Sequence, residues 1–311
     1  MRFHAATLGW TLLLCVPVTA HAQAYLDEAN SLSANFSYSY SPSGKIIATS
    51  SGDDDAIDDF VPGVEVFAHT FTLAAQYVTP VDGLAVDAQL SMVGSKLGEG
   101  SFMHFPNPGP YDDGATHFTL TDFRGGLRYQ VKAIQEILGL SFGVGTTIPV
   151  KDYPTYGFAY PSQHLKALHL GTAIGRTLDP VLPDLFFQLQ YEYSLREKVT
   201  DSPETEKYGR NTSDLNFLLG YFLPAGFSIA AGADVRESHG GVSFAALVFE
   251  GQDVQAAHDR LLDEDIILVG GNLGFDLNDS ISLGLAARFF VWGENTRNQN
   301  LFGANAEYRF F

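Results

Sequence analysis

Charged and amide side chains recur at alternate positions along much of the sequence, and they are its main candidates for binding chemistry. Both signs of charge occur among them, so they could pair with one another and fill an interior. They could also line a charged path for a solute, and the sequence leaves both interpretations open. The candidates for lining such an interior, with one tryptophan among them, are Asp87, Asp122, Arg124, Arg128, His169, Gln188, Gln190, Glu192, Arg196, Asp214, Asp234, Arg236, Asp276, Arg288, Trp292, Glu307 and Arg309.

Aromatic side chains in two proline-containing segments form a second group of candidates. Because such side chains are unfavourable in water, they should pack against one another, fold inward or contact a ligand. Mutual packing is the simpler interpretation, and an apolar vestibule that leads to Phe222, Phe290 and Trp292 is the alternative. The candidates for ligand contact are Phe102, Phe105, Tyr111, Tyr153, Tyr156, Phe158 and Tyr160.

Catalytic chemistry finds little support in the sequence. Nucleophilic hydrolysis needs a serine close to a histidine that a third group orients. Ser238 and His239 are adjacent, but neighbouring residues of a strand point to opposite faces. Gly143 and Gly145 begin a glycine pattern without the third glycine of a phosphate-binding loop. We therefore expect neither an enzyme nor a cofactor.

An acidic cluster is the one motif that suggests a metal. Carboxylate oxygens are the ligands that calcium prefers, but the cluster lacks the glycine and the closing glutamate of an EF-hand loop. Solvated charge that shares cations with lipopolysaccharide phosphates is the favoured interpretation, so no metal site is assigned. The cluster consists of Asp53, Asp54, Asp55, Asp58 and Asp59.

Strands are the elements that would position these side chains, because apolar and polar residues alternate with a period of two. The apolar stretch 215–233 is long enough for a membrane-spanning helix, but Pro224 and Gly226 interrupt it and the alternation continues on both sides. This pattern indicates a hairpin. The twelve predicted strands are 32–41, 67–78, 84–95, 118–131, 138–148, 164–178, 187–196, 215–223, 227–236, 266–277, 281–292 and 301–311.

The connections between these strands alternate in length. Those after even-numbered strands are short, such as 80–83 and 224–226, whereas most of the others are long, such as 97–116 and 240–265. Alternation of this kind is typical of a transmembrane β-barrel, in which closure pairs every backbone polar group. We predict an all-β, up-and-down antiparallel barrel of about twelve strands with both termini in the periplasm.

Composition and the first residues agree with an exported protein. The 311 residues carry 18 basic and 36 acidic side chains, and the net charge of -18 argues against nucleic-acid binding. Arg2, the apolar stretch 5–18 and the small residues Ala22 and Ala24 predict a cleaved secretory signal peptide over 1–24. The barrel domain then spans 25–311, and we expect it in the outer membrane of a Gram-negative bacterium.

The last strand resembles the carboxy-terminal assembly signal of bacterial outer-membrane barrels, with Phe302, Ala304, Ala306, Tyr308 and Phe310 in alternation and Phe311 as a further aromatic. More broadly, the chain resembles the outer-membrane proteins assigned as transporters of the phenol meta-degradation pathway. That resemblance rests on the stretches 121–131, 143–154, 169–179 and 290–298. It implies a barrel that admits hydrophobic or aromatic compounds.

The expected function is an outer-membrane, porin-like channel for passive passage of small hydrophobic or aromatic solutes. A structural or surface-binding barrel with a sealed lumen is the alternative, and an outer-membrane hydrolase is a weaker one. The expected partners are outer-membrane lipid and lipopolysaccharide, the barrel assembly machinery through the last strand, and a small apolar solute. The long segment 242–263 could fold inward as a plug or form a short helix on the rim.

Overall fold

The computed structural model describes residue 26 and residues 28–47, 65–98, 110–134, 137–155, 159–178, 182–199, 209–241 and 263–310. Within these residues, twelve long strands and one short strand, β12 (Thr296–Gln299), form one antiparallel sheet. The long strands are β1 (Leu32–Ile47), β2 (Val66–Val78), β3 (Leu84–Leu97), β4 (His117–Gln130), β5 (Gly139–Pro149), β6 (Ala167–Thr177), β7 (Leu185–Arg196), β8 (Asn211–Phe222), β9 (Phe227–His239), β10 (Asp265–Asn278), β11 (Ile281–Glu294) and β13 (Leu301–Arg309).

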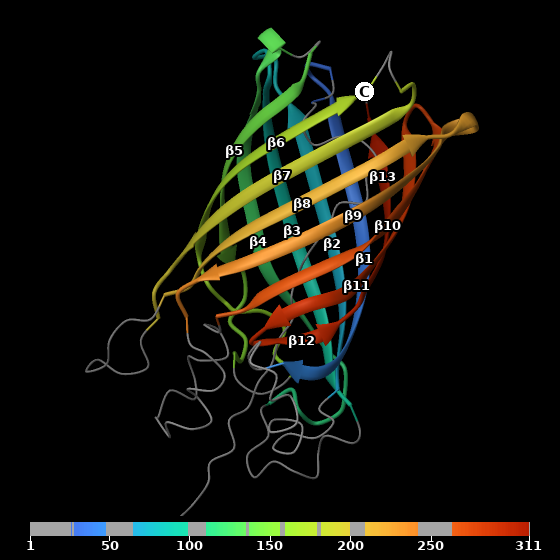
Figure 1. Ribbon diagram of the computed structural model, residues 1–311. Helices are drawn as coiled ribbons and strands as arrows, with labels where there is room; N and C mark the ends of the chain where they lie inside the picture. Colours follow the sequence, from blue (N-terminus) through green and yellow to red (C-terminus); the bar gives the residue numbers. More distant parts are fainter. Residues whose placement is uncertain are drawn as a thin grey trace, which may run out of the picture.

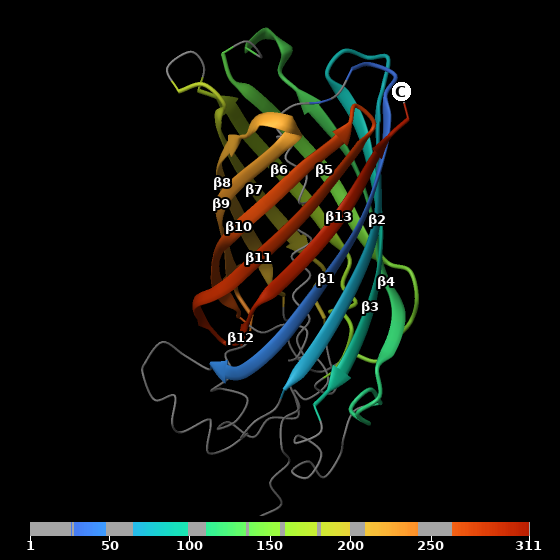
Figure 2. The ribbon, with the colours of Figure 1, turned by 90° about the vertical axis from the view of Figure 1, so that its right-hand side faces the viewer.

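The sheet closes on itself to form a barrel. Each long strand pairs with its neighbours in the sequence, and β1 pairs with both β2 and β13. Figures 1 and 2 show the strands winding around one axis at a marked tilt. Closure leaves no long strand with an open edge. The prediction of an antiparallel barrel of about twelve strands is confirmed.

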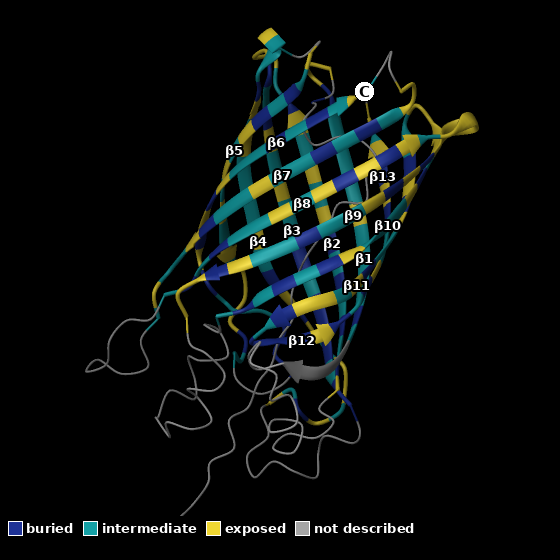
Figure 3. Ribbon diagram, viewed as in Figure 1, coloured by how far each residue is buried: buried dark blue, intermediate teal, exposed yellow. Residues whose placement is uncertain are grey.

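The alternation of the sequence becomes an alternation of exposure along each strand (Figure 3). Leu73, Leu285 and Val291 are more than half exposed on the outer face. Residues of the opposite parity, such as Val93 and Thr121, have no exposed surface. Large apolar side chains therefore cover the outside of the barrel, and polar ones share the inside with small and apolar ones.

The two ends of the barrel differ, as the connection lengths predict. Short connections, among them the 3-10 turns η2 (Lys132–Ile134) and η3 (Pro224–Gly226), lie at the end where β13 finishes (Figure 1). The strand ends that the long connections join lie at the other end, which we call the long-loop end. Which end faces the periplasm stays a prediction. Among the described residues, none belongs to a helix long and apolar enough to cross a membrane.

Several strand boundaries differ from the prediction, and β8, for example, begins at Asn211 and not at 215. Strand β1 continues to Ile47, beyond the expected end at 41, and β12 extends the pairing of β1 past β13. Strand β6 begins at Ala167 and not at 164, because His164 has a φ of 53°, which a strand cannot accommodate. The predicted signal peptide, the acidic cluster, Phe102, Phe105, Tyr156, Phe158 and the segment 242–262 lie outside the described residues.

Candidate functional site in the barrel interior

The inner face carries the charged side chains that the alternation singled out. Arg124 of β4 donates a hydrogen bond to Glu192 of β7, although β5 and β6 lie between these strands. A contact between non-adjacent strands of a closed barrel runs through its interior. The structure thus brings two predicted interior residues together inside the barrel.

The inner wall of β3 to β7 is partly accessible to solvent, and we call it the open wall. Arg124 is 40% exposed, and the ion pair of Arg128 with Asp87, at 3.2 Å, has side chains 23% and 32% exposed. Asp87 also accepts a hydrogen bond of 2.7 Å from Gln76. Glycines contribute to this accessibility: a Cβ added to Gly143 would meet one backbone oxygen at 3.6 Å and nothing closer.

His169 is the centre of a hydrogen-bonded group on the open wall. Its Nε2 lies 2.7 Å from Thr147 Oγ1, and its Nδ1 lies 2.9 Å from Ser194 Oγ. The same Nδ1 lies 3.1 Å from Glu192 Oε1, so a carboxylate faces one side of the ring and a hydroxyl the other. The sequence predicted His169 and Glu192 as interior residues but did not single out Thr147 and Ser194, although Ser194 has the parity of Glu192 and Arg196.

The inner wall of β8 to β11 is filled, and we call it the packed wall. Arg288 Nε donates to Asp234 Oδ2 at 2.6 Å, and the two side chains are 0% and 4% exposed. A second nitrogen, Nη1 of Arg288, donates to Asn272 Oδ1 at 2.7 Å. Asp234 also accepts a hydrogen bond from Asn216. Leu218 and Ala230 are buried on the same wall.

A second buried group of charges lies at the long-loop end of the packed wall. Arg210 donates to Glu264 at 3.1 Å, and neither side chain has exposed surface. Arg210 also donates a hydrogen bond to Ser238, and Thr296 donates one to Glu264 at 2.5 Å. Burial lowers the pKa of Arg210 below its usual range, and the charge of Glu264 opposes that shift. Sequence reasoning missed this pair because both residues stand just outside the alternating segments.

A segment of the β5–β6 connection, Ala159–Gln163, lies against the inside of the barrel at the long-loop end, and we call it the strap. Ser95 of β3 donates to the carbonyl of Ala159, whose N–H donates to Asp112 at 2.9 Å. Ser162 donates to Asp122 of β4 at 2.8 Å, and Gln163 accepts from Arg196 of β7. The strap therefore connects β3 and β4 with the non-adjacent strand β7.

Two predicted loop aromatics are buried around the strap. Tyr160 lies within it and is 1% exposed, and Tyr153 is 5% exposed. Tyr153 packs edge-on against His164, with the ring centroids 4.9 Å apart. Tyr111 stacks on His117 at 4.8 Å. Tyr153 and Tyr160 are thus folded inward, and the ring contacts of Tyr153 and Tyr111 are with histidines, while contact with a ligand stays a prediction.

The other predicted interior residues lie along the same inner faces. Arg236 pairs with Asp214 at 2.5 Å, and Gln188 is 4% exposed. Near the short connections, Ser282 donates to Asp276 at 2.6 Å and Arg309 donates to Glu307 at 3.3 Å. Gln190 lies opposite Asn216 in the register of β7 and β8.

Trp292 is the exception, and its predicted place in the interior is wrong. Ile267 pairs with Trp292 while the next residue, Leu268, pairs with Phe290, so Val291 is an extra residue in β11. This bulge shifts the parity of the strand by one position. Phe290 therefore packs on the buried Ile266 and Leu268 inside the barrel, whereas Trp292 is 41% exposed outside.

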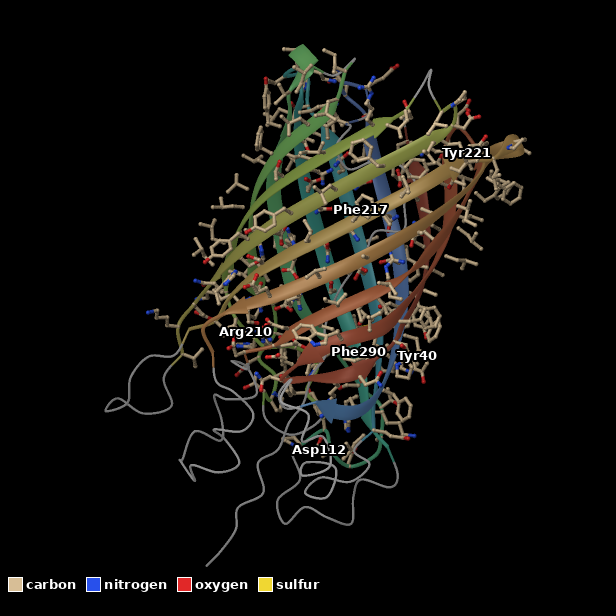
Figure 4. The ribbon with its side chains drawn as sticks, in the orientation of Figure 1. Tyr40, Asp112, Arg210, Phe217, Tyr221 and Phe290 are labelled. Atoms are coloured by element: carbon tan, nitrogen blue, oxygen red, sulfur yellow. The ribbon has the colours of Figure 1, made fainter. Side chains whose placement is uncertain are left out.

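Figure 4 places labelled side chains on this architecture. Asp112 and Arg210 lie at the long-loop end, where the strap and the buried ion pair are found. Phe217 and Tyr221 belong to the outer parity of β8, with 39% and 41% exposure. At the opposite end, Leu26 is buried with Val78 and Ala85, and its N–H donates to Gln130 at 3.2 Å.

No known protein family and no curated protein matches the sequence. Among solved structures, the chain is similar to the COG4313 outer membrane channel from Pseudomonas putida F1, with 11% identity over 93% of this chain and 98% of the channel, at a TM-score of 0.65. The translocator domain of autotransporter NalP from Neisseria meningitidis has 13% identity over 91% and 90%, with a TM-score of 0.46. The KdgM porin has 8% identity over 89% and 99%, with a TM-score of 0.43. The first of these likenesses supports the barrel fold.

Proposed function

We propose that the protein is an outer-membrane channel that gives small hydrophobic or aromatic solutes passive passage. The contrast between the two faces of the wall carries this proposal. The outer face is apolar, with Leu73 57% and Leu285 57% exposed, and such a surface is stable in hydrocarbon but not in water. The inner face carries Arg124, Arg128 and Asp87 with solvent-accessible charge, which suits a water-filled path.

The fold neighbours support the class of function without defining the solute. The COG4313 protein is an outer membrane channel, and its barrel extends over nearly the whole of this chain. The preference for aromatic solutes rests on the resemblance to transporters of the phenol meta-degradation pathway and on the aromatic segments next to the long-loop end. Membership of that transporter family stays a proposal.

Localisation and partners follow from the same proposal. An apolar outer wall would contact outer-membrane lipid and lipopolysaccharide, and the closing strand β13 would engage the barrel assembly machinery. Tyr38, His69, Phe71, Thr116 and Phe118 line a pocket of about 420 Å³ on the outer face of the barrel. Aromatic rings at this place suit the border between lipid tails and head groups.

Planar-bilayer recording of the purified, refolded protein tests the channel. We expect discrete ohmic steps of current. Gly143→Leu should lower the conductance, because the leucine side chain would project from the open wall into the lumen. The matched control is Val144→Leu on the outer face of the same strand, which should leave the conductance unchanged. A silent barrel of confirmed fold would contradict the proposal. Benzyl alcohol should block the current more strongly than glycerol if aromatic solutes are preferred.

Hydrolysis is a second candidate function, and the surroundings of His169 are the observation that favours it. Thr147, His169 and Glu192 place a hydroxyl, an imidazole and a carboxylate in series, as nucleophilic hydrolases do. Purified protein should then hydrolyse p-nitrophenyl butyrate, and His169→Ala should abolish that activity. Equal rates for the two proteins would exclude this site.

A further inference from the structure

Two interior residues of opposite charge stand apart from the ion pairs described above. Asp122 accepts a hydrogen bond from Ser162 at its Oδ2, and its buried Oδ1 has no partner. Arg196 donates from Nη1 to Gln163 and from Nη2 to Thr212 at 3.4 Å, and its buried Nε has no partner. Among the described residues, no ion pair involves either of them.

Several other interior arginines pair directly with a carboxylate. Arg288 contacts Asp234, and Arg236 contacts Asp214. Asp122 and Arg196 differ because two consecutive strap residues, Ser162 and Gln163, are hydrogen-bonded to the carboxylate and to the guanidinium. Arg196 also has electrostatic interactions with four nearby charged groups. They are the guanidiniums of Arg210 and Arg236 and the carboxylates of Asp214 and Glu264. Those four groups are paired with one another, whereas Arg196 has neutral partners.

The chemistry of the two strap residues indicates what else could bind there. Ser162 presents a hydroxyl donor to Asp122, and Gln163 presents a carbonyl acceptor to Arg196. A solute with a hydroxyl and a carboxylate would present the same two groups. Its carboxylate would bind more strongly than an amide, because charge-assisted bonds to a guanidinium are about twice as strong as neutral ones and are often bidentate. A solute carboxylate in the place of the Gln163 amide would therefore accept from Nη1 of Arg196.

We propose that Asp122 and Arg196 form a binding subsite for small hydroxylated carboxylates, which Ser162 and Gln163 of the strap occupy as internal ligands. The inference rests on the proposed channel function and narrows its solute class. A simple anion would satisfy Arg196 but be repelled by Asp122, and a neutral alcohol would leave the guanidinium without an anion. A solute with both groups satisfies both residues.

The anchoring of the strap permits this exchange. At its first residue, Ala159, the carbonyl accepts from Ser95 and the N–H donates to Asp112. These bonds do not involve Ser162 or Gln163. The hydrogen bonds of Ser162 and Gln163 to Asp122 and Arg196 would be replaced when a solute binds, while the bonds of Ala159 hold the start of the strap.

Equilibrium dialysis of the refolded protein in nanodiscs, with ¹⁴C-labelled 2-, 3- and 4-hydroxybenzoate, tests the subsite. We expect at least one isomer to bind about tenfold more tightly than benzoate or the matching hydroxybenzyl alcohol, since a lost charge-assisted hydrogen bond costs at least about this factor. Arg196→Gln and Asp122→Asn should each abolish that preference. The double variant Ser162→Ala/Gln163→Ala should bind more tightly than the wild type, because it removes the internal ligands.

Arg176→Gln is the control, since Arg176 of β6 has the parity of Leu168 and Leu170, which are exposed on the outer face. It should bind like the wild type. Equal affinity for hydroxybenzoates and benzoate, or unchanged binding in both Arg196→Gln and Asp122→Asn, would overturn the subsite. Dialysis needs no conduction, so a barrel that is silent in bilayers but binds selectively would remove the channel and keep the subsite. Conduction without selective binding would remove the subsite and keep the channel.

Discussion

The two walls of the barrel interior use the same kind of ion pair in different surroundings. On the packed wall, Arg288 and Asp234 are almost fully buried and their hydrogen bonds are shared with Asn272 and Asn216. On the open wall, Arg124 pairs with a carboxylate yet keeps 40% of its surface exposed. The neighbouring residues decide the outcome, because the same kind of pair is structural where it is enclosed and accessible to a solute where it is not.

Glycine residues also differ in their surroundings between the packed wall and the open wall. A Cβ on Gly270, on the packed wall, would lie 1.9 Å from the carbonyl oxygen of Ala287. A Cβ on Gly143, on the open wall, would approach its nearest neighbour, Leu127 O, no closer than 3.6 Å. The first glycine permits close packing of two strands, and the second leaves space in the lumen. A count of glycines along the sequence cannot separate these roles.

The largest effect should come from Arg288→Met. This change leaves Asp234 buried without its charge partner, which costs about 3 to 5 kcal/mol of unfolding free energy. Urea unfolding followed by the fluorescence of Trp292 measures it. The double variant Arg288→Met/Asp234→Leu removes both charges and should be less destabilised than the single one. A single variant as stable as the wild type would show that the packed wall is not held by this pair.

Gly270→Ala should come next, because the backbone of β11 must move away from the new methyl group. Overpacking of this kind costs about 1 to 3 kcal/mol. Gly143→Ala is the matched control on the open wall, and it should unfold at nearly the same urea concentration as the wild type. The comparison between the walls would fail if the two alanine variants were equally destabilised.

Arg124→Gln should change stability less than Arg288→Met does, because Arg124 keeps 40% of its surface in solvent and Glu192 keeps its contact with His169. Its effect should appear in transport. Removal of one positive charge from the open wall should shift the reversal potential in a salt gradient towards cation selectivity. Arg288→Gln, if it folds, should leave the reversal potential unchanged, because its side chain has no contact with the lumen solvent.

The smallest effect belongs to the exposed pair of Asp113 and His117 outside the wall, whose atoms lie 2.7 Å apart. The hydrogen bond from His117 is the largest of the interactions that lower the pKa of Asp113 below its usual value of 3.8. A carboxyl with a lowered folded-state pKa stabilises the fold above its unfolded pKa, and that contribution disappears as pH falls through the folded value. Carbon-detected NMR titration should show the lowered pKa, and His117→Gln should bring it back towards 3.8.

The alternation of the sequence was sufficient to predict every long strand, because a wall one strand thick separates two environments and each residue must suit one of them. Trp292 shows the limit of that argument. A bulge at Val291 changes the parity without changing the composition, so period two alone assigns the wrong face beyond it. Strand β12 was missed because its residues, Thr296–Gln299, are polar and pair at the rim.

The sequence was sufficient to predict most residues of the candidate site, but not which of them contact one another. Parity identified Asp122, Arg124 and Glu192 as interior residues, but it carries no information on contacts across the barrel. The partner of Arg124 lies three strands away, and Asp122 and Arg196 each bind a residue of a loop. Distances through the interior depend on the tilt and closure of the whole sheet, which no short stretch of sequence encodes.

Pairing of β1 with β13 brings Ser33 opposite Arg309 and so joins the two ends of the chain. Contacts of such high sequence separation form slowly, because nearly the whole chain must be ordered before they can form. Until then the first and last strands each expose an unpaired edge, which can pair with other chains and aggregate. Truncation of β13 should therefore prevent assembly altogether, whereas shortening a long connection should be tolerated. The chain must be kept unfolded and protected until its final residues arrive.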